Sequence, residues 1–348
     1  MAANYWNSSH CNRWIFSKIK LEELLEKNYQ FILPEHRKTI MFFFHKKIIQ
    51  TGTIMKCPQK IISTCHVIFK RFYLIKKLTE HDPWLIFPTC FYLSSKIEEW
   101  FISANVLIEA ISKITKWEYT SEDIFQNELL VLGILGYDLI VFHPYKMLTE
   151  IQEKGQFQEL YQLAWSIIND SYFTDLCLLY SPYLLTLASL FIASITSSVD
   201  ITSWFSQLQI TNETLTEIKK VANIVLEFYK EQPLLNQHSE KIDALLEVVK
   251  FAQEAETKNG ENPLHLVCYK NTNPDVIQEM LKYTDPNILN GETPLHVSCR
   301  NGNVISAHYL IEAKADTTIR NNELASDLIP SDSAHPELLQ LLMKTKKK

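Results

Sequence analysis

The sequence predicts an all-α protein in which two successive helical domains are followed by a short helical solenoid. Only four of the seven glycines precede residue 255, and the apolar residues of that region recur at helical spacing instead of alternating. The stretch from Asp82 to Trp100 is apolar on nearly every side, so neighbouring helices must bury it. Beyond residue 258 a duplicated segment appears, which is typical of repeat proteins.

Composition narrows the possible partners. The chain has 348 residues, of which 46% are apolar and 21% charged, with a net charge of −6. Such a chain is globular, and it offers no bulk attraction to nucleic acid or to anionic lipid, so we expect neither as a direct partner. The seven cysteines show no CxxC spacing, which suits buried thiols in a reducing compartment. The first residues lack a secretory signal pattern, and we expect a nuclear or cytoplasmic protein.

The stretch between Asp175 and Asp200 carries no charge and is long enough to cross a bilayer. Pro182 and many hydroxyl groups interrupt it, however, and in character it resembles the stretch that begins at Asp82. A second buried central helix therefore explains it without a membrane.

The spacing of apolar residues predicts each helix in turn. The helix after Asp82 has a good N-cap in Asp82 and a proline at its first position. It ends in Glu98 and Glu99, which lie against the negative end of the helix dipole, so either something outside uses them or they are simply solvated. The other helices are predicted at residues 12–26, 36–50, 58–76, 104–114, 121–135, 145–153, 157–171, 176–197 with a bend near Pro182, 201–208, 212–232 and 238–253.

Several strings resemble the cyclin family, and within it the cyclin C group. They are NYWNSSH at 4–10, FKRFY at 69–73, DPWLIFPTCFYLSSKIEE at 82–99, VFHPY at 141–145 and LAWSIINDSYFTDLCLLYSPY at 163–183. The resemblance implies two tandem five-helix cyclin boxes, no catalytic activity and no cofactor. It also implies a surface that binds and activates a cyclin-dependent kinase, which for this group is the Mediator-associated kinase of transcription regulation in the nucleus. The expected parts are an N-terminal arm helix (1–35), a first box (36–140), a second box (141–235), a linker helix (236–257) and ankyrin repeats (258–344).

The resemblance also implies which residues contact the kinase. Lys96 and Glu128 match the lysine and glutamate that bond kinase backbone in the family. The apolar contacts are expected from Leu85, Leu93, Ile97 and Leu132. We expect Leu93, Lys96, Ile97 and Glu128 to form one exposed patch. Without the resemblance, an ordinary surface lysine and glutamate would explain Lys96 and Glu128 equally well.

A second surface is implied in the second box, where the family has a polar and aromatic groove for another subunit of the kinase module. Trp165, Asn169 and Asp170 match it on one helix, and Tyr229 supplies a further wall. Trp165 and Asn169 are four residues apart and share a helix face. A buried tryptophan with satisfied polar neighbours is the alternative interpretation.

The C-terminal segment resembles ankyrin repeats. GENPLHLVC at Gly260 and GETPLHVSC at Gly291 recur 31 residues apart. Pro263 and Pro294 start helices after a capping residue, whereas His265 and His296 are expected to bond loop backbone and not a metal. A degenerate third unit is predicted from Asn322. Because each repeat buries its apolar face only against neighbours, we expect the first repeat to pack on the 238–253 helix or on the second box. The protein that these repeats bind is not named by the sequence.

No sequence motif for catalysis, phosphate binding or metal binding is present, and we expect no metal site. An enzyme would need an unrecognised arrangement such as His143 with Asp138. The main alternative is an adaptor protein that binds through its ankyrin repeats without activating a kinase. A promoter-binding protein with tandem cyclin boxes would need a basic stripe that this composition lacks. The terminal KTKKK is either a solvated tail or a nuclear import signal.

Overall fold

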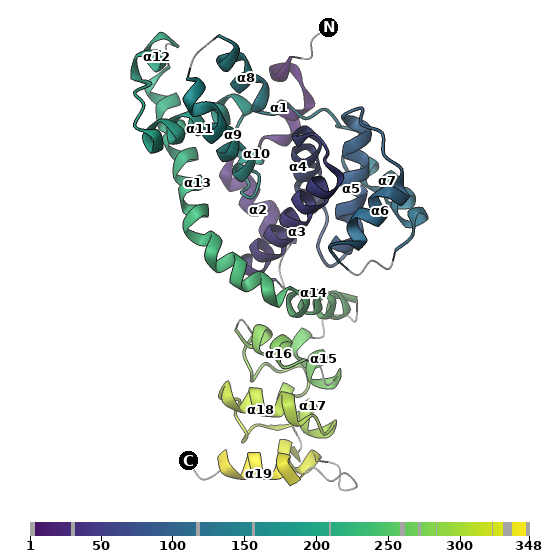
Figure 1. Ribbon diagram of the computed structural model, residues 1–348. Helices are drawn as coiled ribbons and strands as arrows, with labels where there is room; N and C mark the ends of the chain where they lie inside the picture. The colour runs from purple at the N-terminus through teal and green to yellow at the C-terminus, as the bar shows by residue number, and fades with distance from the viewer. Residues whose placement is uncertain are drawn as a thin grey trace. The chain divides into compact units, whose positions relative to one another are not determined.

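The computed structural model describes residues 4–28, 32–115, 119–154, 157–208, 210–257, 262–270, 273–282, 284–321, 323–329 and 336–345. The chain divides into two compact units, residues 1–29 with 41–237 and residues 30–40 with 238–348. Helices dominate both units (Figure 1), which confirms the predicted all-α class. Within the described residues, strands are confined to one antiparallel pair, β1 (Arg320–Asn321) and β2 (Glu323–Leu324).

The helices of the N-terminal arm and the first predicted box follow one another in the expected order. They are η1 (Tyr5–Asn7), α1 (Ser9–Trp14), α2 (Lys18–Asn28), α3 (Pro34–Met55), α4 (Gln59–Ile75), α5 (Pro83–Ile97), α6 (Ala104–Ser112) and α7 (Ser121–Ile134). The predicted single helix at 12–26 is wrong, because the chain leaves the helix between α1 and α2. There the backbone N–H of Phe16 donates to the carbonyl of Leu178 at 2.8 Å, and this tertiary bond replaces a helical one.

Helix α5 is the central helix of the first box, as its apolar sequence predicted. The carboxylate of Asp82 accepts a hydrogen bond from the N–H of Trp84 at 2.9 Å, and Pro83 occupies the first turn. Every residue from Ile86 to Ser95 is buried. Helices α4, α6 and α7 all pack against it, and Figure 1 shows α6 and α7 beside it. The small residues Ser94 and Ser95 are fully buried and donate to carbonyls of their own helix, so neighbouring backbones can approach closely.

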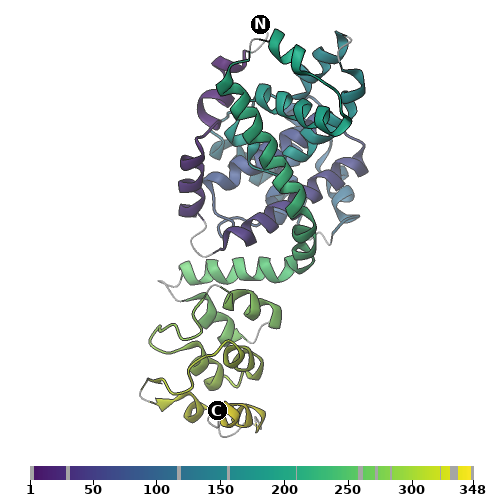
Figure 2. The ribbon, with the colours of Figure 1, turned by 90° about the vertical axis from the view of Figure 1, so that its left-hand side faces the viewer.

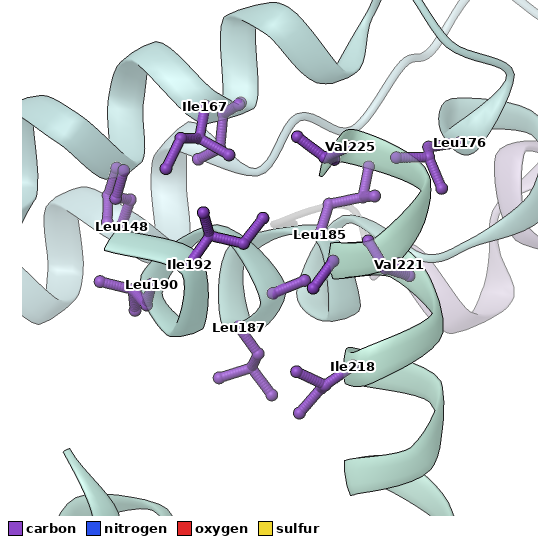
Figure 3. Close-up of a cluster of buried hydrophobic side chains, with 14 of the residues drawn as sticks. Leu148, Ile167, Leu176, Leu185, Leu187, Leu190, Ile192, Ile218, Val221 and Val225 are labelled. Carbon is purple, nitrogen blue, oxygen red and sulfur yellow. The ribbon is translucent and has the colours of Figure 1, made fainter. Parts of the chain in front are cut away.

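The second predicted box is built around a helix of the same character. Its elements are α8 (Tyr145–Glu153), α9 (Gln158–Ser171), α10 (Leu176–Leu179), α11 (Pro182–Ser197), α12 (Thr202–Gln207) and α13 (Asn212–His238). Figure 3 shows side chains of α8, α9, α11 and α13 gathered into one apolar core, among them Leu148, Ile167, Ile192 and Val225.

Two boundaries predicted in this region are wrong. The expected helix 176–197 is two helices, because the residue before a proline is disfavoured in the helical region. Ser181 is extended and caps α11, with Pro182 in its first turn. Helix α13, by contrast, continues past Gln232 and through Pro233 to His238. Leu235 is buried against Phe42 and Phe228, and this packing outweighs the hydrogen bond that a proline removes.

Across the described residues no helix is both long and apolar enough to cross a bilayer. The charge-free stretch after Asp175 is divided between α10 and α11.

The second unit is a stack of short helices with its own core. It contains η2 (Ser239–Lys241), α14 (Ile242–Thr257), α15 (Pro263–Lys270), α16 (Pro274–Leu281), α17 (Pro294–Arg300), α18 (Val304–Glu312), β1, β2, η3 (Ala325–Leu328) and α19 (Pro336–Thr345). Figure 2 shows the pairs α15–α16 and α17–α18 as successive layers, with α19 following.

Helix α14, expected as a linker, shares the core of the repeats. Ala244, Val248 and Phe251 are buried in the same cluster as Leu264 and Ile277. The expectation that the first repeat packs on the 238–253 helix is therefore confirmed. The degenerate third repeat supplies Ala325, Leu338 and Leu342 to that core. Asn322, its predicted first residue, lies outside the described residues.

Candidate functional site

The first candidate surface lies at the C-terminal end of α5, where α7 packs beside it. Lys96 Nζ donates to both carboxylate oxygens of Glu128, each at 2.8 Å. The ammonium also lies 4.3 Å from the ring centre of Tyr92. Burial alone would lower the pKa of Lys96, but the hydrogen bond and charge of Glu128, together with Tyr92, raise it overall. The structure thus brings Lys96 and Glu128 together as one charged pair.

The pair keeps capacity for further hydrogen bonds. An ammonium has three donors, and a carboxylate accepts about four hydrogen bonds. Two donor contacts of Lys96 go to Glu128, and 41% of the Lys96 side chain is exposed, against 13% for Glu128. A backbone carbonyl could therefore bind Lys96, and a backbone N–H could bind Glu128, while the two side chains stay paired.

The predicted apolar contacts divide into three groups. Ile97 and Leu132 are half-buried and lie on the same two helices as the charged pair. Leu93 is only 3% exposed, so the expectation that it belongs to the exposed patch is wrong. It lies one turn before Lys96 and faces the core. Leu85 is half-buried but lies 11 residues from Lys96 along α5, which corresponds to about 16 Å, so it does not join the pair.

Exposed apolar side chains that the sequence reasoning missed lie on α7 and beyond α5. Leu129 is 73% exposed and directly follows Glu128, and Phe125, 40% exposed, contacts the ring of Tyr92. Phe101, after the end of α5, is 86% exposed. The spacing of Phe125, Leu129 and Leu132 on one face of α7 is a helical signal that could have identified the first two.

Glu98 has its partners within the chain. Its side chain is only 5% exposed and pairs with Lys60. The hydroxyl of Thr64 donates to Glu98 Oε1 at 2.6 Å and also lies 2.8 Å from His143 Nε2. The chain's own α4 thus uses Glu98, which corrects both interpretations offered for it, whereas Glu99 is exposed.

The four residues of the second candidate surface form two groups. Trp165 and Asn169 both contact Tyr145, and Asp170 bonds Tyr229. The Trp165 ring lies 4.5 Å from that of Tyr145, whose hydroxyl donates to Asn169 Oδ1 at 2.8 Å. Tyr229 on α13 donates to Asp170 Oδ2, also at 2.8 Å. Trp165, Asn169, Asp170 and Tyr229 are all half-buried. Asn169 Oδ1, Asp170 Oδ2 and the Tyr229 hydroxyl have partners within the chain, and each of the four side chains keeps a part of its surface for contact.

Burial shapes the titration of the Asp170 and Tyr229 pair. It raises the pKa of Asp170, although the hydrogen bond from Tyr229 acts in the opposite direction. It also raises the pKa of Tyr229, and the adjacent carboxylate raises it further. Tyr229 is therefore a donor at neutral pH.

Pro263, Pro294 and His265 of the ankyrin residues lie where the sequence predicts them. Pro263 and Pro294 begin α15 and α17, and the capping bonds come from Asn262 and Thr293. His265 Nε2 lies 2.8 Å from the carbonyl of Glu292, which links two successive repeats. His296 Nδ1 lies 2.6 Å from the hydroxyl of Thr293, in the loop that precedes α17.

Among the described residues, no group of three or more His, Cys, Asp or Glu side chains could hold a metal ion. His143, which an enzyme would need together with Asp138, is half-buried. It contacts Thr64 and Tyr172, and Asp138 pairs with Arg13 and Trp14 instead.

Comparison with known families gives three matches along the chain. The cyclin N-terminal domain matches residues 13–140, the cyclin C-terminal domain matches 141–253, and three copies of ankyrin repeats match 234–321. The last match begins before α14, in agreement with the shared core of that helix and the repeats.

Related proteins are found in animals and plants. The chain is 34% identical over 275 residues to Cyclin-C of Rattus norvegicus, covering 76% of this chain and 96% of the relative. It is 36% identical over 246 residues to Cyclin-C of Drosophila melanogaster, covering 66% and 91%. It is 35% identical over 235 residues to Cyclin-C1-1 of Oryza sativa subsp. japonica, covering 66% and 90%.

Solved structures with the same fold are more distant in sequence. A chain of the CAK complex of Chaetomium thermophilum bound to ATP-γ-S matches with a TM-score of 0.60 at 18% identity, covering 74% of this chain and 96% of that one. A chain of the yeast RNA Pol II CTD kinase complex CTDK-1 matches with a TM-score of 0.56 at 17% identity, covering 64% and 75%. From the sequence matches, with the central α5 and α11 and the repeat core, the chain belongs to the cyclin family and carries ankyrin repeats at its C-terminal end.

Proposed function

We propose that this chain is a non-catalytic regulatory subunit that binds and activates a cyclin-dependent kinase in transcription, and that its kinase is of the Mediator-associated type. The observation that carries the proposal is the Lys96–Glu128 pair beside exposed apolar side chains of α7 and the half-buried Ile97 of α5. Relatives named Cyclin-C and structural matches within kinase complexes support it.

The mechanism depends on the shape and chemistry of such a surface. A cyclin-dependent kinase is inactive until one of its helices moves inward and its glutamate reaches the lysine that holds the ATP phosphates. A rigid surface that binds only the inward position shifts this equilibrium toward the active state. Leu129 and Ile97 supply apolar contact, while Lys96 and Glu128 have spare bonding capacity for backbone groups of the incoming segment.

The second candidate surface fits a further subunit of the same assembly. Trp165 and Tyr229 offer partly exposed aromatic area, which is common at protein interfaces. Asn169 accepts a hydrogen bond from Tyr145, whose ring contacts Trp165, and Asp170 accepts one from Tyr229, so both aromatic rings are held in place. On this proposal the protein acts in the nucleus and touches nucleic acid only through its partners.

The ankyrin repeats add a surface for another protein. Tyr269 is 63% exposed and Leu289 is 65% exposed, and both lie outside the repeat core. An adaptor without kinase activation would use the same residues, so these side chains do not separate the two functions.

Reconstitution with a purified kinase separates kinase activation from an adaptor function. The purified full chain, added to a Mediator-associated kinase, is expected to form a stoichiometric complex and to raise phosphorylation of an RNA polymerase II tail peptide by at least tenfold. A complex without any rise in turnover would make the chain an adaptor. The proposal would be overturned if the chain formed no complex with any transcriptional cyclin-dependent kinase.

A further inference from the structure

The second cyclin box has a hollow between α11 and α13 that takes no part in the proposed kinase contacts or in the Trp165 surface. Its volume is about 200 Å³. Its lining includes Phe191 and Ile195 on α11 and Lys219, Ala222, Asn223 and Leu226 on α13. Ile195 is 64% exposed and Leu226 is 43% exposed, so the hollow has an apolar rim that is open to solvent.

One wall of this hollow corresponds to the helix that carries Lys96 in the first box, because α11 repeats the geometry of α5 with an offset of 99 residues. Asp82 and Ser181 are both N-caps, each followed by a proline. At the other end Glu99 and Ser198 share the same positive φ of 56°.

The bonds that close the two helices also correspond. The N–H of Trp100 donates to the carbonyl of Ser95 at 2.8 Å, and the N–H of Val199 donates to that of Ser194 at 2.9 Å. The offset places Ile195 at the position of Lys96.

The two boxes differ in the side chain that fills that position. In the first box the Lys96 ammonium spans to Glu128 and covers the space between the helices. In the second box Ile195 makes no such bridge, and the facing Ala222, itself 3% exposed, is small. Ile192 lines the hollow and belongs, with Val225, to the apolar core of the second box (Figure 3). The space beside Ile195 and Ala222 is left unfilled by the side chains that the structure describes.

Charge at the rim favours an acidic partner. Lys219 is exposed and forms no ion pair with any carboxylate that the structure describes, whereas its neighbour Lys220 pairs with Glu217 at 2.8 Å. The Asn223 side chain beside it is also exposed and can bond either a carboxylate or an amide.

We propose that this hollow binds an amphipathic helix of a second protein, which inserts one large apolar side chain beside Ile195 and places an Asp or Glu one turn away on Lys219. A volume of about 200 Å³ has room for a leucine or an aromatic ring, since cavities of about 150 Å³ hold benzene. Two helical walls suit a third helix, whose side chains pack into the groove between them. This site is on the second box and does not depend on which kinase binds the first.

A counter-selected peptide library tests the proposal on the full chain. Helical peptides displayed on phage are first depleted on the Ile195→Asp variant and then enriched on the unaltered protein. The enriched peptides are expected to share a large apolar residue with Asp or Glu three or four positions away.

Synthetic copies of the enriched peptides then give the affinities. Lys219→Glu is expected to weaken binding at least tenfold, and a peptide with Lys in place of its acid is expected to recover most of that loss. Lys230→Glu, also an exposed lysine on α13 but about 16 Å further along, should change affinity by less than twofold.

Three outcomes would overturn the inference. They are no enrichment after counter-selection, enriched peptides that bind the Lys219→Glu variant equally well, and self-association of the chain that Ile195→Asp abolishes. The last would assign the hollow to a second copy of this protein. Ile195 and Lys219 are exposed, so both variants are expected to fold, and their melting temperatures check this.

Discussion

Lys96 and Glu128 lie 32 residues apart in the chain, yet the ammonium of one donates to both carboxylate oxygens of the other at 2.8 Å. Part of this pair is open to solvent, so its contribution to folding is small, on the order of 1 kcal/mol or less. Its value lies in holding two charged groups in fixed positions beside apolar surface. Stability and kinase binding should therefore respond differently to changes in these two residues.

Charge reversal at Lys96 and Glu128 separates the effect on stability from the effect on kinase binding. We expect Lys96→Glu and Glu128→Lys each to lower kinase affinity at least tenfold, because each puts the wrong charge against backbone groups of the partner. The double variant Lys96→Glu with Glu128→Lys restores the internal pair and the stability. It should not restore kinase binding, since the donor and the acceptor have exchanged places.

Quantitative pull-down and urea denaturation measure the two properties. Lys113→Glu is a matched control, because Lys113 is an exposed lysine that pairs with Glu109, four residues earlier, on the exposed side of α6. If the double variant binds the kinase as well as the unaltered protein does, the pair acts through stability alone and the interface assignment is wrong.

A second prediction concerns Glu98, whose buried carboxylate joins Lys60 and Thr64. Removing it in Glu98→Ala leaves the Thr64 hydroxyl with only His143, so we expect a loss of about 1–3 kcal/mol in the free energy of unfolding. The adjacent Glu99 is exposed, and Glu99→Ala should change stability by less than about 0.5 kcal/mol. Urea midpoints for the two variants give the comparison. Equal losses would show that the burial of Glu98 does not matter.

Glu98 also shows where reasoning from the sequence stops. Asp82 and Pro83 predict the start of α5 correctly, because an N-cap and a first-turn proline act within one turn of the helix. The role of Glu98 depends on Thr64, which is 34 residues away on another helix. Local charge pattern therefore suggested a solvated end or an outside partner, and neither is correct.

Leu93 and Phe16 illustrate two further limits. Leu93 is expected at the surface from the family resemblance, yet it is only 3% exposed. In a helix that is apolar on nearly every side, periodicity cannot say which face meets the core, so it could not correct this expectation. The helix predicted at 12–26 is interrupted between α1 and α2, where the N–H of Phe16 donates to the carbonyl of Leu178, a contact that the pattern of apolar residues does not encode. The repeats were easier, since duplicated residues such as Pro263 and Pro294 report the same local geometry twice.

A third prediction concerns pH. Burial lowers the pKa of His10, His66 and His143 from about 6.5 to about 3 in the folded protein, and neighbouring cationic groups add to the effect. Unfolding returns each ring to its ordinary pKa, so below pH 6.5 the unfolded chain binds more protons. Stability should be full above pH 6.5 and decline between pH 6.5 and 3, by up to about 1.4 kcal/mol per pH unit for each histidine.

Urea midpoints at pH 7 and pH 5 measure this dependence. His10 Nδ1 accepts a hydrogen bond from the N–H of Phe142 at 3.0 Å, and an asparagine oxygen can take the same bond without titrating. His10→Asn should therefore reduce the pH dependence by about a third. An unchanged dependence would show that His10 is accessible to protons in the folded protein.

The last prediction concerns the ankyrin repeats and the helix that precedes them. Because Val248 and Phe251 of α14 are buried in the same core as Leu264 and Ile277, a fragment of residues 258–348 has lost one wall of that core. Each repeat buries its apolar face only against a neighbour, so this fragment should lack a cooperative thermal transition. The fragment 238–348 regains the wall and should melt at a higher temperature and more sharply.

Within the longer fragment, Val248→Asp should return the melt to that of residues 258–348, because Val248 is fully buried. Lys241→Glu, which reverses an exposed charge facing Asp275, should have a much smaller effect. Circular dichroism melts of the four proteins decide the question. If residues 258–348 alone melt as sharply as residues 238–348, the repeats are self-sufficient and α14 is a linker after all.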